Sequence, residues 1–363
     1  MVDHDWCIRP HTRAKHALLE EYLKGWYAVI GARERRAIFL DGFAGRGVYA
    51  DGSPGSPVIA LRTLLAHSAF KRLSQCEFVF LFVEEDPDNL ASLQQEVAKL
   101  GTLPRNIRVR CLHSTFADAA VRLTGQLTEQ KKALAPTFAF IDPFGLKGLP
   151  MTTIGELLSS PKCELFVNFM VDHANRFANV PAVSATMDSL FGCRDYLAAA
   201  GAPDRMAFLA DLYKRQLHAA AGFEFVSRFE MRRGTGRVAY HLLHGTNHLR
   251  GVELMKTAMW KVDPGTGSCF SDRFAGQDVL LGGEHIDAAP LRLALCQHFA
   301  GQTVSLYDVK RYTLVKTPYG PGHWKTHALK PLEDGGKITV RRPAGVRRGS
   351  FAEKKDIKVT FPR

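Results

Sequence analysis

A short apolar run that ends in an acidic residue and a glycine loop constrains this chain most. The run covers residues 38–40, and Asp41 and the loop Gly42-Phe43-Ala44-Gly45-Arg46-Gly47 follow it. An apolar run bounded by turn residues predicts a buried strand of a parallel sheet, and ligands of such sheets bind beyond the carboxyl ends of the strands. Gly45 and Gly47 would let the backbone pass close to a ligand. A tight strand-to-helix turn is the alternative interpretation of this loop.

Asp41 changes the kind of ligand that we expect at this loop. A carboxylate at a strand tip repels a pyrophosphate but can hold a cation, such as the methionine ammonium of S-adenosylmethionine. We therefore predict that the methionine end of this cofactor is bound by Asp41 and by the loop residues Gly42, Phe43, Gly45 and Gly47.

The next two predicted strands end in further polar residues. Residues 78–83 are apolar and lead into Glu84-Glu85-Asp86, where one carboxylate could accept hydrogen bonds from both ribose hydroxyls of a nucleoside. We choose Glu84 for that role, with capping of the following helix as the alternative for the acidic trio. A third strand, residues 107–112, precedes Ser114 and Thr115, which could contact an adenine amino group or cap the next helix.

The fourth predicted strand, residues 138–141, runs directly into Asp142-Pro143-Phe144-Gly145. This tetrapeptide predicts a stiff ledge at a strand end, because proline fixes the backbone. Asp142 would accept a hydrogen bond from a target amine, and Phe144 would stack on a planar substrate. These two residues are our candidates for the catalytic side of the site.

The remaining patterns of residues 1–262 complete one α/β domain. An amphipathic helix is expected over residues 11–30, where Lys15 and His16 could reach a ligand but are more simply solvated. Ser56 followed by Pro57 predicts the N-cap of a second helix. A fifth strand begins at residue 163, and strand-like runs at 223–232 and 237–247 predict a closing β-hairpin. Five parallel strands closed by an antiparallel hairpin indicate the Rossmann-like sheet of class I methyltransferases.

The last part of the chain, residues 290–363, predicts a small second domain after a Gly-rich linker over 263–289. Three short helices followed by two strands are typical of a winged helix-turn-helix. The helices are expected at residues 291–299, 306–314 with Ser305 as N-cap, and 324–333, and the strands at 338–341 and 357–361.

This second domain carries most of the positive charge. Residues 290–363 hold 15 Lys and Arg against 5 Asp and Glu, or +10 of the net charge of +12. A local excess of this kind indicates an anionic partner, here nucleic acid, although some winged helices bind proteins and a basic tail can simply be solvated. The predicted nucleic-acid contacts are Lys325 on the third helix and Arg342, Arg347, Arg348, Lys354 and Lys355 in the wing.

Composition excludes several other classes of protein. The seven cysteines are scattered and contain no Cys-x-x-Cys pair, so neither a disulfide framework nor a zinc cluster is indicated, and we predict no metal site. No apolar run approaches the roughly 20 residues of a membrane helix. Since the first residues also lack a signal-peptide pattern, we expect a cytoplasmic protein.

Several of these motifs together resemble the three-Cys-motif partner proteins (TcmP). The matching pieces extend over nearly the whole chain and include His11-Thr12, Leu40-Asp41-Gly42-Phe43-Ala44-Gly45-Arg46-Gly47, Gly55-Ser56-Pro57, Phe140-Ile141-Asp142-Pro143-Phe144-Gly145, Val167-Asn168-Phe169-Met170, Leu254-Met255-Lys256, Ala258-Met259-Trp260 and Thr317-Pro318-Tyr319. The resemblance implies a methyltransferase domain with a C-terminal winged helix and a partner protein that bears a three-cysteine motif. Two departures concern the substrate: Asp-Pro-Phe-Gly is not the Pro-Pro-aromatic ledge of amino-methyltransferases, and Ser114 stands where many methyltransferases have an acid.

The leading hypothesis is an S-adenosylmethionine-dependent methyltransferase that acts on an amino group of a nucleic acid. A non-catalytic adaptor, which senses the cofactor and binds nucleic acid or protein, is the alternative from a different class. A nicotinamide oxidoreductase is disfavoured by Asp41 and by the closing hairpin.

Overall fold

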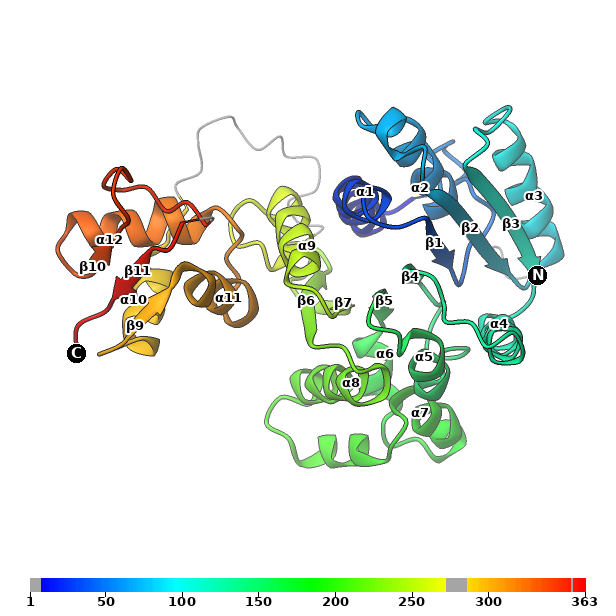
Figure 1. Cartoon of the computed structure of the whole chain (residues 1–363). Coiled ribbons are helices and arrows are strands. Elements are labelled where there is room, and N and C mark those ends of the chain that lie inside the picture. The colour runs from blue at the N-terminus through cyan, green and yellow to red at the C-terminus, as the bar shows by residue number, and fades with distance from the viewer. Residues whose placement is uncertain (1–7, 272–285, 354) are drawn as a thin grey trace. The chain divides into compact units, whose positions relative to one another are not determined.

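The computed structural model describes residues 8–271, 286–353 and 355–363, which belong to two compact units (Figure 1). One unit comprises Met1–Gly251 and Cys269–Ala275, and the other comprises Val252–Ser268 and Gly276–Arg363. The division falls inside helix α9 (Leu249–Val262), earlier than the expected domain end at residue 262. Part of the expected linker over 263–289 lies outside the described residues.

The first unit is built on an eight-stranded sheet with the order β3-β2-β1-β4-β5-β7-β6-β8. Strands β1 to β5 are parallel to one another, and β7 runs antiparallel between β5 and β6. The strands are β1 (Arg36–Asp41), β2 (Glu77–Glu84), β3 (Ile107–His113), β4 (Thr137–Ile141), β5 (Cys163–Phe169), β6 (Phe225–Arg232), β7 (Val238–Thr246) and β8 (Cys269–Ser271). The predicted Rossmann-like class I methyltransferase sheet with its closing hairpin is confirmed. Strand β8, which pairs with β6, lies inside the segment expected to be linker.

Helices pack on both faces of this sheet (Figure 1). They are α1 (Pro10–Gly31), α2 (Ser56–Leu65), η1 (Phe70–Leu73), α3 (Pro87–Ala98), α4 (Phe116–Glu129), α5 (Met151–Leu158), α6 (Val171–Phe177), η2 (Pro181–Val183), α7 (Ser184–Phe191), η3 (Asp195–Gly201) and α8 (Arg205–Ala221). The N-cap of α2 is Gly55, so the prediction that Ser56 caps this helix is wrong.

Side-chain alternation divides the strands between two layers of core. One layer is aromatic: the ring of Phe138 stacks on Phe39 at 6.1 Å and on Tyr22 of α1 at 4.9 Å. We call this side of the sheet the aromatic face, and its strand residues are Phe39, Phe80, Phe82, Phe138, Phe140 and Phe166. The opposite layer is aliphatic and joins residues such as Leu40 and Leu165 to α5 and α8.

The second unit combines short helices with a three-stranded antiparallel sheet of order β10-β11-β9. Its further elements are α10 (Ala289–His298), β9 (Thr303–Ser305), α11 (Leu306–Lys316), η5 (Trp324–Leu329), α12 (Lys330–Asp334), β10 (Thr339–Arg341) and β11 (Lys358–Thr360). As predicted, Ser305 is the N-cap of α11, where it forms a capping box with Asp308.

The helix predicted over residues 324–333 is interrupted. It consists of the π-helical turn η5 and the short helix α12 with Pro331 in its first turn. Because proline has no N–H, it cannot donate to the carbonyl one turn earlier. That carbonyl belongs to His327, and the guanidinium of Arg292 donates to it instead at 2.9 Å.

None of the helices among the described residues is both long and apolar enough to cross a membrane.

Candidate functional site

The carboxyl ends of β1, β2 and β4 bring Asp41, Glu84 and Asp142 to one edge of the sheet. Each of these carboxylates follows, by two positions, a residue of the aromatic face: Phe39, Phe82 and Phe140. Because side chains alternate along a strand, the three carboxylates continue that face into the polar edge. The acids at the strand ends therefore lie at one edge of the sheet, as predicted.

Asp41 is fully buried and is held by two neutral donors. The hydroxyl of Ser56 donates to its carboxylate at 2.6 Å, and the backbone N–H of Phe43 donates at 3.2 Å. Burial raises the pKa of Asp41 to about 7 against the effect of these hydrogen bonds, and the charges of Asp142 and Glu84 raise it further. A cation at this position would stabilise the charged form of Asp41, which fits the ammonium group predicted from the sequence.

Glu84 fixes the glycine loop to the second strand. The backbone N–H of Gly45 donates to one carboxylate oxygen at 2.7 Å, and that of Asp86 donates to the other at 2.9 Å. Gly45 and Gly47 have φ angles of 61° and 76°, in the left-handed region that favours glycine. Asp86 is the N-cap of α3, so the capping role considered for the acidic trio belongs to Asp86 and not to Glu84.

The other two loop residues have packing roles. A Cβ atom on Gly42 would lie 2.7 Å from side-chain atoms of Ile141 and Phe116, so a larger residue does not fit there. The ring of Phe43 lies 6.0 Å from that of Phe116 and packs toward the core. Its backbone N–H, rather than its ring, takes part in the site.

The residues considered for adenine binding differ from each other. Thr115 is the N-cap of α4: its hydroxyl accepts from the N–H of Asp118 and donates to its carboxylate. Capping, one of the two alternatives, is thus observed for Thr115. Ser114 lies beside Glu84, since its N–H donates to the Glu84 carbonyl at 3.0 Å. Contact of either residue with adenine stays a prediction.

Asp142 is not a free acceptor, because it has two partners from distant parts of the chain. The ammonium of Lys15 forms an ion pair with one carboxylate oxygen, and the amide nitrogen of Asn168 donates to the other at 2.8 Å. Burial alone would raise the pKa of Asp142, but the charge and hydrogen bond of Lys15 and the Asn168 amide outweigh it and hold this pKa below its usual range.

Lys15 and His16 are only 5% and 6% exposed, so the expectation that they are solvated is wrong. Burial lowers the pKa of His16 to about 3, and the charge of Lys15 adds to this effect. The ring of Tyr49 lies 5.7 Å from that of His16, and the Lys15 ammonium lies 5.9 Å from the ring centre of Tyr240. These residues enclose the Asp142 end of the site.

Sequence reasoning missed Asn168, Tyr49 and Tyr240 as parts of the site. A signal for Asn168 was present, because it follows Phe166 of the aromatic face by two positions, as the three strand-end acids follow their own aromatic residues. Phe144 is 80% exposed, so its predicted stacking role would be exercised at the protein surface.

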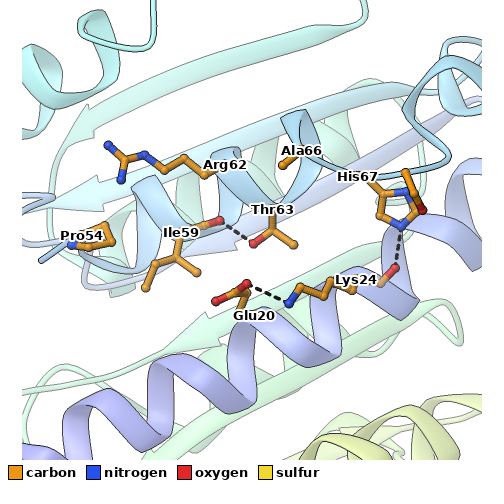
Figure 2. A pocket seen from close by; sticks show the side chains of 9 residues that line it. Glu20, Lys24, Pro54, Ile59, Arg62, Thr63, Ala66 and His67 are labelled. Atoms are coloured by element: carbon orange, nitrogen blue, oxygen red, sulfur yellow. Dashed lines mark hydrogen bonds and ion pairs between the residues drawn. The ribbon is translucent and has the colours of Figure 1, made fainter.

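A pocket of about 490 Å³ lies elsewhere in the first unit, between α1 and α2 (Figure 2). Its lining residues are Glu20, Lys24, Pro54, Ile59, Arg62, Thr63, Ala66, His67 and Ser68. None of them is a predicted site residue. Several of its polar groups already bind each other or the backbone: Lys24 pairs with Glu20, His67 with the Lys24 carbonyl, and Thr63 with the Ile59 carbonyl.

The basic residues predicted to contact nucleic acid are of two kinds. Arg342 is a structural residue: its guanidinium binds both carboxylate oxygens of Glu333, at 2.5 and 2.7 Å, and its side chain is 9% exposed. This pairing leaves little of the guanidinium exposed, and a phosphate contact of Arg342 stays a prediction. Lys325 forms an ion pair with Glu353 at 2.6 Å.

The remaining predicted contacts lie in the loop between β10 and β11. Arg347, Arg348 and Lys355 are exposed there, and the guanidinium of Arg348 donates to the Glu333 carbonyl at 3.4 Å. Lys354 lies outside the described residues. Among the predicted nucleic-acid contacts, the exposed ones that the structure describes are thus Arg347, Arg348 and Lys355.

Comparison with known proteins gives structural likenesses only. No protein-family model matches the chain, and no curated protein sequence matches it. Several solved structures, among them the following three, are similar over part of the chain. Protein LPL1258 from Legionella pneumophila, of family DUF519, is 14% identical with a TM-score of 0.40, over 69% of this chain and 92% of that one.

The other two structures were solved with a bound cofactor or its product. Trm1 from Pyrococcus horikoshii, in complex with S-adenosyl-L-methionine, is 12% identical with a TM-score of 0.37, over 70% of this chain and 61% of that one. The plantazolicin methyltransferase BpumL, in complex with SAH, is 11% identical with a TM-score of 0.31, over 65% of this chain and 86% of that one. At identities of 11–14%, these likenesses concern the fold alone.

Proposed function

We propose that this protein is an S-adenosylmethionine-dependent methyltransferase that acts on an amino group of a nucleic acid. The observation that carries the proposal is the edge of the sheet where Asp41, the glycine loop and Glu84 meet. Asp41 would hold the ammonium of the methionine part, and Glu84 the ribose. The two remaining lone pairs of Glu84 suffice for two hydroxyl groups.

The bound cofactor would supply an activated methyl group, and the protein would supply alignment. Methyl transfer needs little covalent help, because most of the gain comes from holding the acceptor nitrogen in line with the methyl group. Asp142 and its partners Lys15 and Asn168 lie beside Asp41 on the same face of the sheet, so they form the natural acceptor side. Phe144 would stack on the acceptor ring.

The nucleic-acid target is supported by the second unit. Its order of helix, strand, two helices and two strands supports the predicted winged helix, and its loop between β10 and β11 carries exposed Arg347, Arg348 and Lys355. Cations on a wing can bind phosphates. The partnership with a three-cysteine-motif protein is supported by the sequence resemblance to TcmP proteins.

Calorimetry with S-adenosylhomocysteine tests the cofactor site. Asp41→Ala and Glu84→Ala should each weaken binding by roughly 1.5–3 kcal/mol, the scale of a hydrogen bond to a charged group. The far-ultraviolet spectra should stay unchanged. If the wild type does not bind, or if both variants bind as tightly as the wild type, the cofactor assignment is lost.

Tritiated methyl transfer to DNA, RNA and cell lysate tests turnover. A methyltransferase should label one of these pools, and the labelled class identifies the acceptor. A protein that binds S-adenosylhomocysteine but transfers no methyl group, alone or with its partner, would instead be the cofactor-sensing adaptor.

A further inference from the structure

Asn168 has one polar atom that the described part of the chain leaves unpaired. Its amide nitrogen donates to Asp142 at 2.8 Å and lies 3.6 Å from the sulfur of Met170. Because an ionised carboxylate accepts hydrogen bonds and does not donate them, this contact fixes which end of the amide faces Asp142. The amide oxygen of Asn168 is then buried, and it has no hydrogen-bond partner among the residues that the structure describes.

An unpaired buried acceptor is costly in a protein interior, because it loses the hydrogen bond that water gives it in the unfolded chain. Such atoms are rare, and each one calls for a physical reason such as a ligand that pairs with it. Asn168 is 6% exposed and stands at the carboxyl end of β5, next to Asp142 at the end of β4. Ligands of parallel sheets bind at this edge.

The surroundings of Asn168 call for a hydrogen-bond donor, which need not carry a charge. Lys15 already neutralises Asp142, so the carboxylate beside Asn168 does not call for a second cation. His16, which follows Lys15 on α1, has a second buried atom without a partner, Nδ1. Two unpaired polar atoms in one cluster indicate that this end of the site is completed by a polar ligand.

We propose that the amide oxygen of Asn168 accepts the N–H of the methyl-accepting group, and that Asp142 acts on the acceptor through Asn168 by fixing its orientation. This inference rests on the proposed function. It makes Asn168 a specificity-determining residue that selects acceptors with an N–H over acceptors with no donor. It also assigns to Asp142 a positioning role in place of the direct contact predicted from the sequence.

The chemistry of methyl transfer is consistent with a neutral acceptor oxygen. The acceptor nitrogen uses its lone pair to form the N–C bond, while the S–C bond breaks and its electron pair goes to sulfur. The additional proton then leaves the methylated nitrogen for water. An amide oxygen can orient the N–H without removing its proton, so the nitrogen lone pair stays directed at the methyl group.

Sinefungin tests this inference without a known acceptor. This cofactor analogue carries an amino group in place of the transferred methyl, so its N–H groups point toward the acceptor side, whereas S-adenosylhomocysteine has no donor there. We expect the wild type to prefer sinefungin. Asn168→Leu should reduce the ratio of the two affinities by about tenfold, the scale of one hydrogen bond to a charged group, with little change for S-adenosylhomocysteine.

Two further variants control for structural effects. Asn168→Gln keeps both the amide nitrogen that donates to Asp142 and an oxygen acceptor, so it should retain the preference for sinefungin, even if Asn168→Leu proves too unstable to measure. Asn175→Leu is the matched control, because Asn175 has a similarly unpaired buried amide oxygen on α6. It should leave the ratio unchanged.

The outcomes separate the two levels of the proposal. If the wild type binds neither compound, the proposed cofactor function fails and this inference fails with it. If S-adenosylhomocysteine binds but the affinity ratio is the same in the wild type and in Asn168→Leu, or is lost in Asn168→Gln, only the role of Asn168 is overturned.

Discussion

At the scale of single residues, Asp41 carries the main electrostatic conflict of the site. Its carboxylate is buried, but its described hydrogen-bond donors, Ser56 and Phe43, are neutral. Burial raises the pKa of Asp41 to about 7, so the free protein holds a proton there in mildly acidic solution. An ammonium group favours the charged carboxylate, and its binding would therefore release that proton.

We predict that S-adenosylhomocysteine affinity rises with pH below about 7 and levels off above it, because only the ionised Asp41 binds the ammonium. Asp41→Asn should remove this pH dependence along with most of the affinity. Calorimetry in buffers of different ionisation enthalpy should detect proton release at about pH 6 in the wild type only. The same pH profile in the variant would assign the effect to another group.

Asp41 also links pH to folding. Its pKa is higher in the folded state than in the unfolded chain, so its stabilising contribution is complete below the unfolded value, near 4, and is lost as the pH rises through about 7. At about pH 8, the free energy of unfolding of Asp41→Asn should therefore exceed that of the wild type by roughly 1–3 kcal/mol. Urea unfolding of both proteins at several pH values measures this difference, and a variant less stable at every pH would contradict it.

At the scale of elements, helix α1 links the two ends of the sheet. Near its start, Lys15 pairs with Asp142 at the functional edge. Further along, the hydroxyl of buried Tyr22 donates to Glu164 of β5, which also accepts from Thr246 of β7 at 2.8 Å. The helix is thus attached to the sheet by polar contacts as well as by its aromatic packing.

We predict strong coupling between Lys15 and Asp142. Lys15→Met should destabilise the protein by about 1–3 kcal/mol, because it leaves the half-buried Asp142 carboxylate without its cation. Combining it with Asp142→Asn should recover much of this loss. A double-mutant cycle from urea unfolding measures the coupling, and additive effects would show that the pair does not interact in solution.

The same elements show which features the sequence could and could not predict. Asp41 and Glu84 were predictable, because the end of a buried parallel strand is a local pattern and such ends meet at one edge. The ion pair between Lys15 and Asp142 was not, because it joins residues 127 positions apart and depends on how α1 crosses the sheet. Arg342 looked like an exposed wing cation, because only the folded unit places it against Glu333.

At the scale of the whole molecule, the carboxylates of the second unit decide which of its cations are available to a partner. Glu333 binds Arg342, and Glu353 binds both Lys310 and Lys325. These cations support the unit itself. Among the predicted phosphate contacts, the cations that remain exposed in the loop between β10 and β11 are therefore the ones available to a partner.

We predict that replacing Arg347 and Lys355 together by alanine weakens nucleic-acid binding and leaves folding and S-adenosylhomocysteine binding intact, since both side chains are exposed and lie outside the first unit. Each lost phosphate contact should flatten the slope of log affinity against log salt by about 0.9 for duplex DNA or about 0.7 for single strands. Fluorescence anisotropy with labelled DNA and RNA at several salt concentrations measures the slope.

The matched control replaces Lys131 and Lys132 by alanine. This double replacement removes the same charge from an exposed site of the first unit, and it should leave the slope unchanged. Arg342→Ala should instead destabilise the second unit, because it leaves the buried carboxylate of Glu333 without its partner. Full-length variants are preferable to a truncation near Pro290, since Lys256 and Trp260 of α9 donate to the carbonyls of Thr317 and Pro318. Equal slopes for the wild type and the Arg347 and Lys355 variant would mean that these cations do not bind phosphates and would favour a protein partner for the second unit.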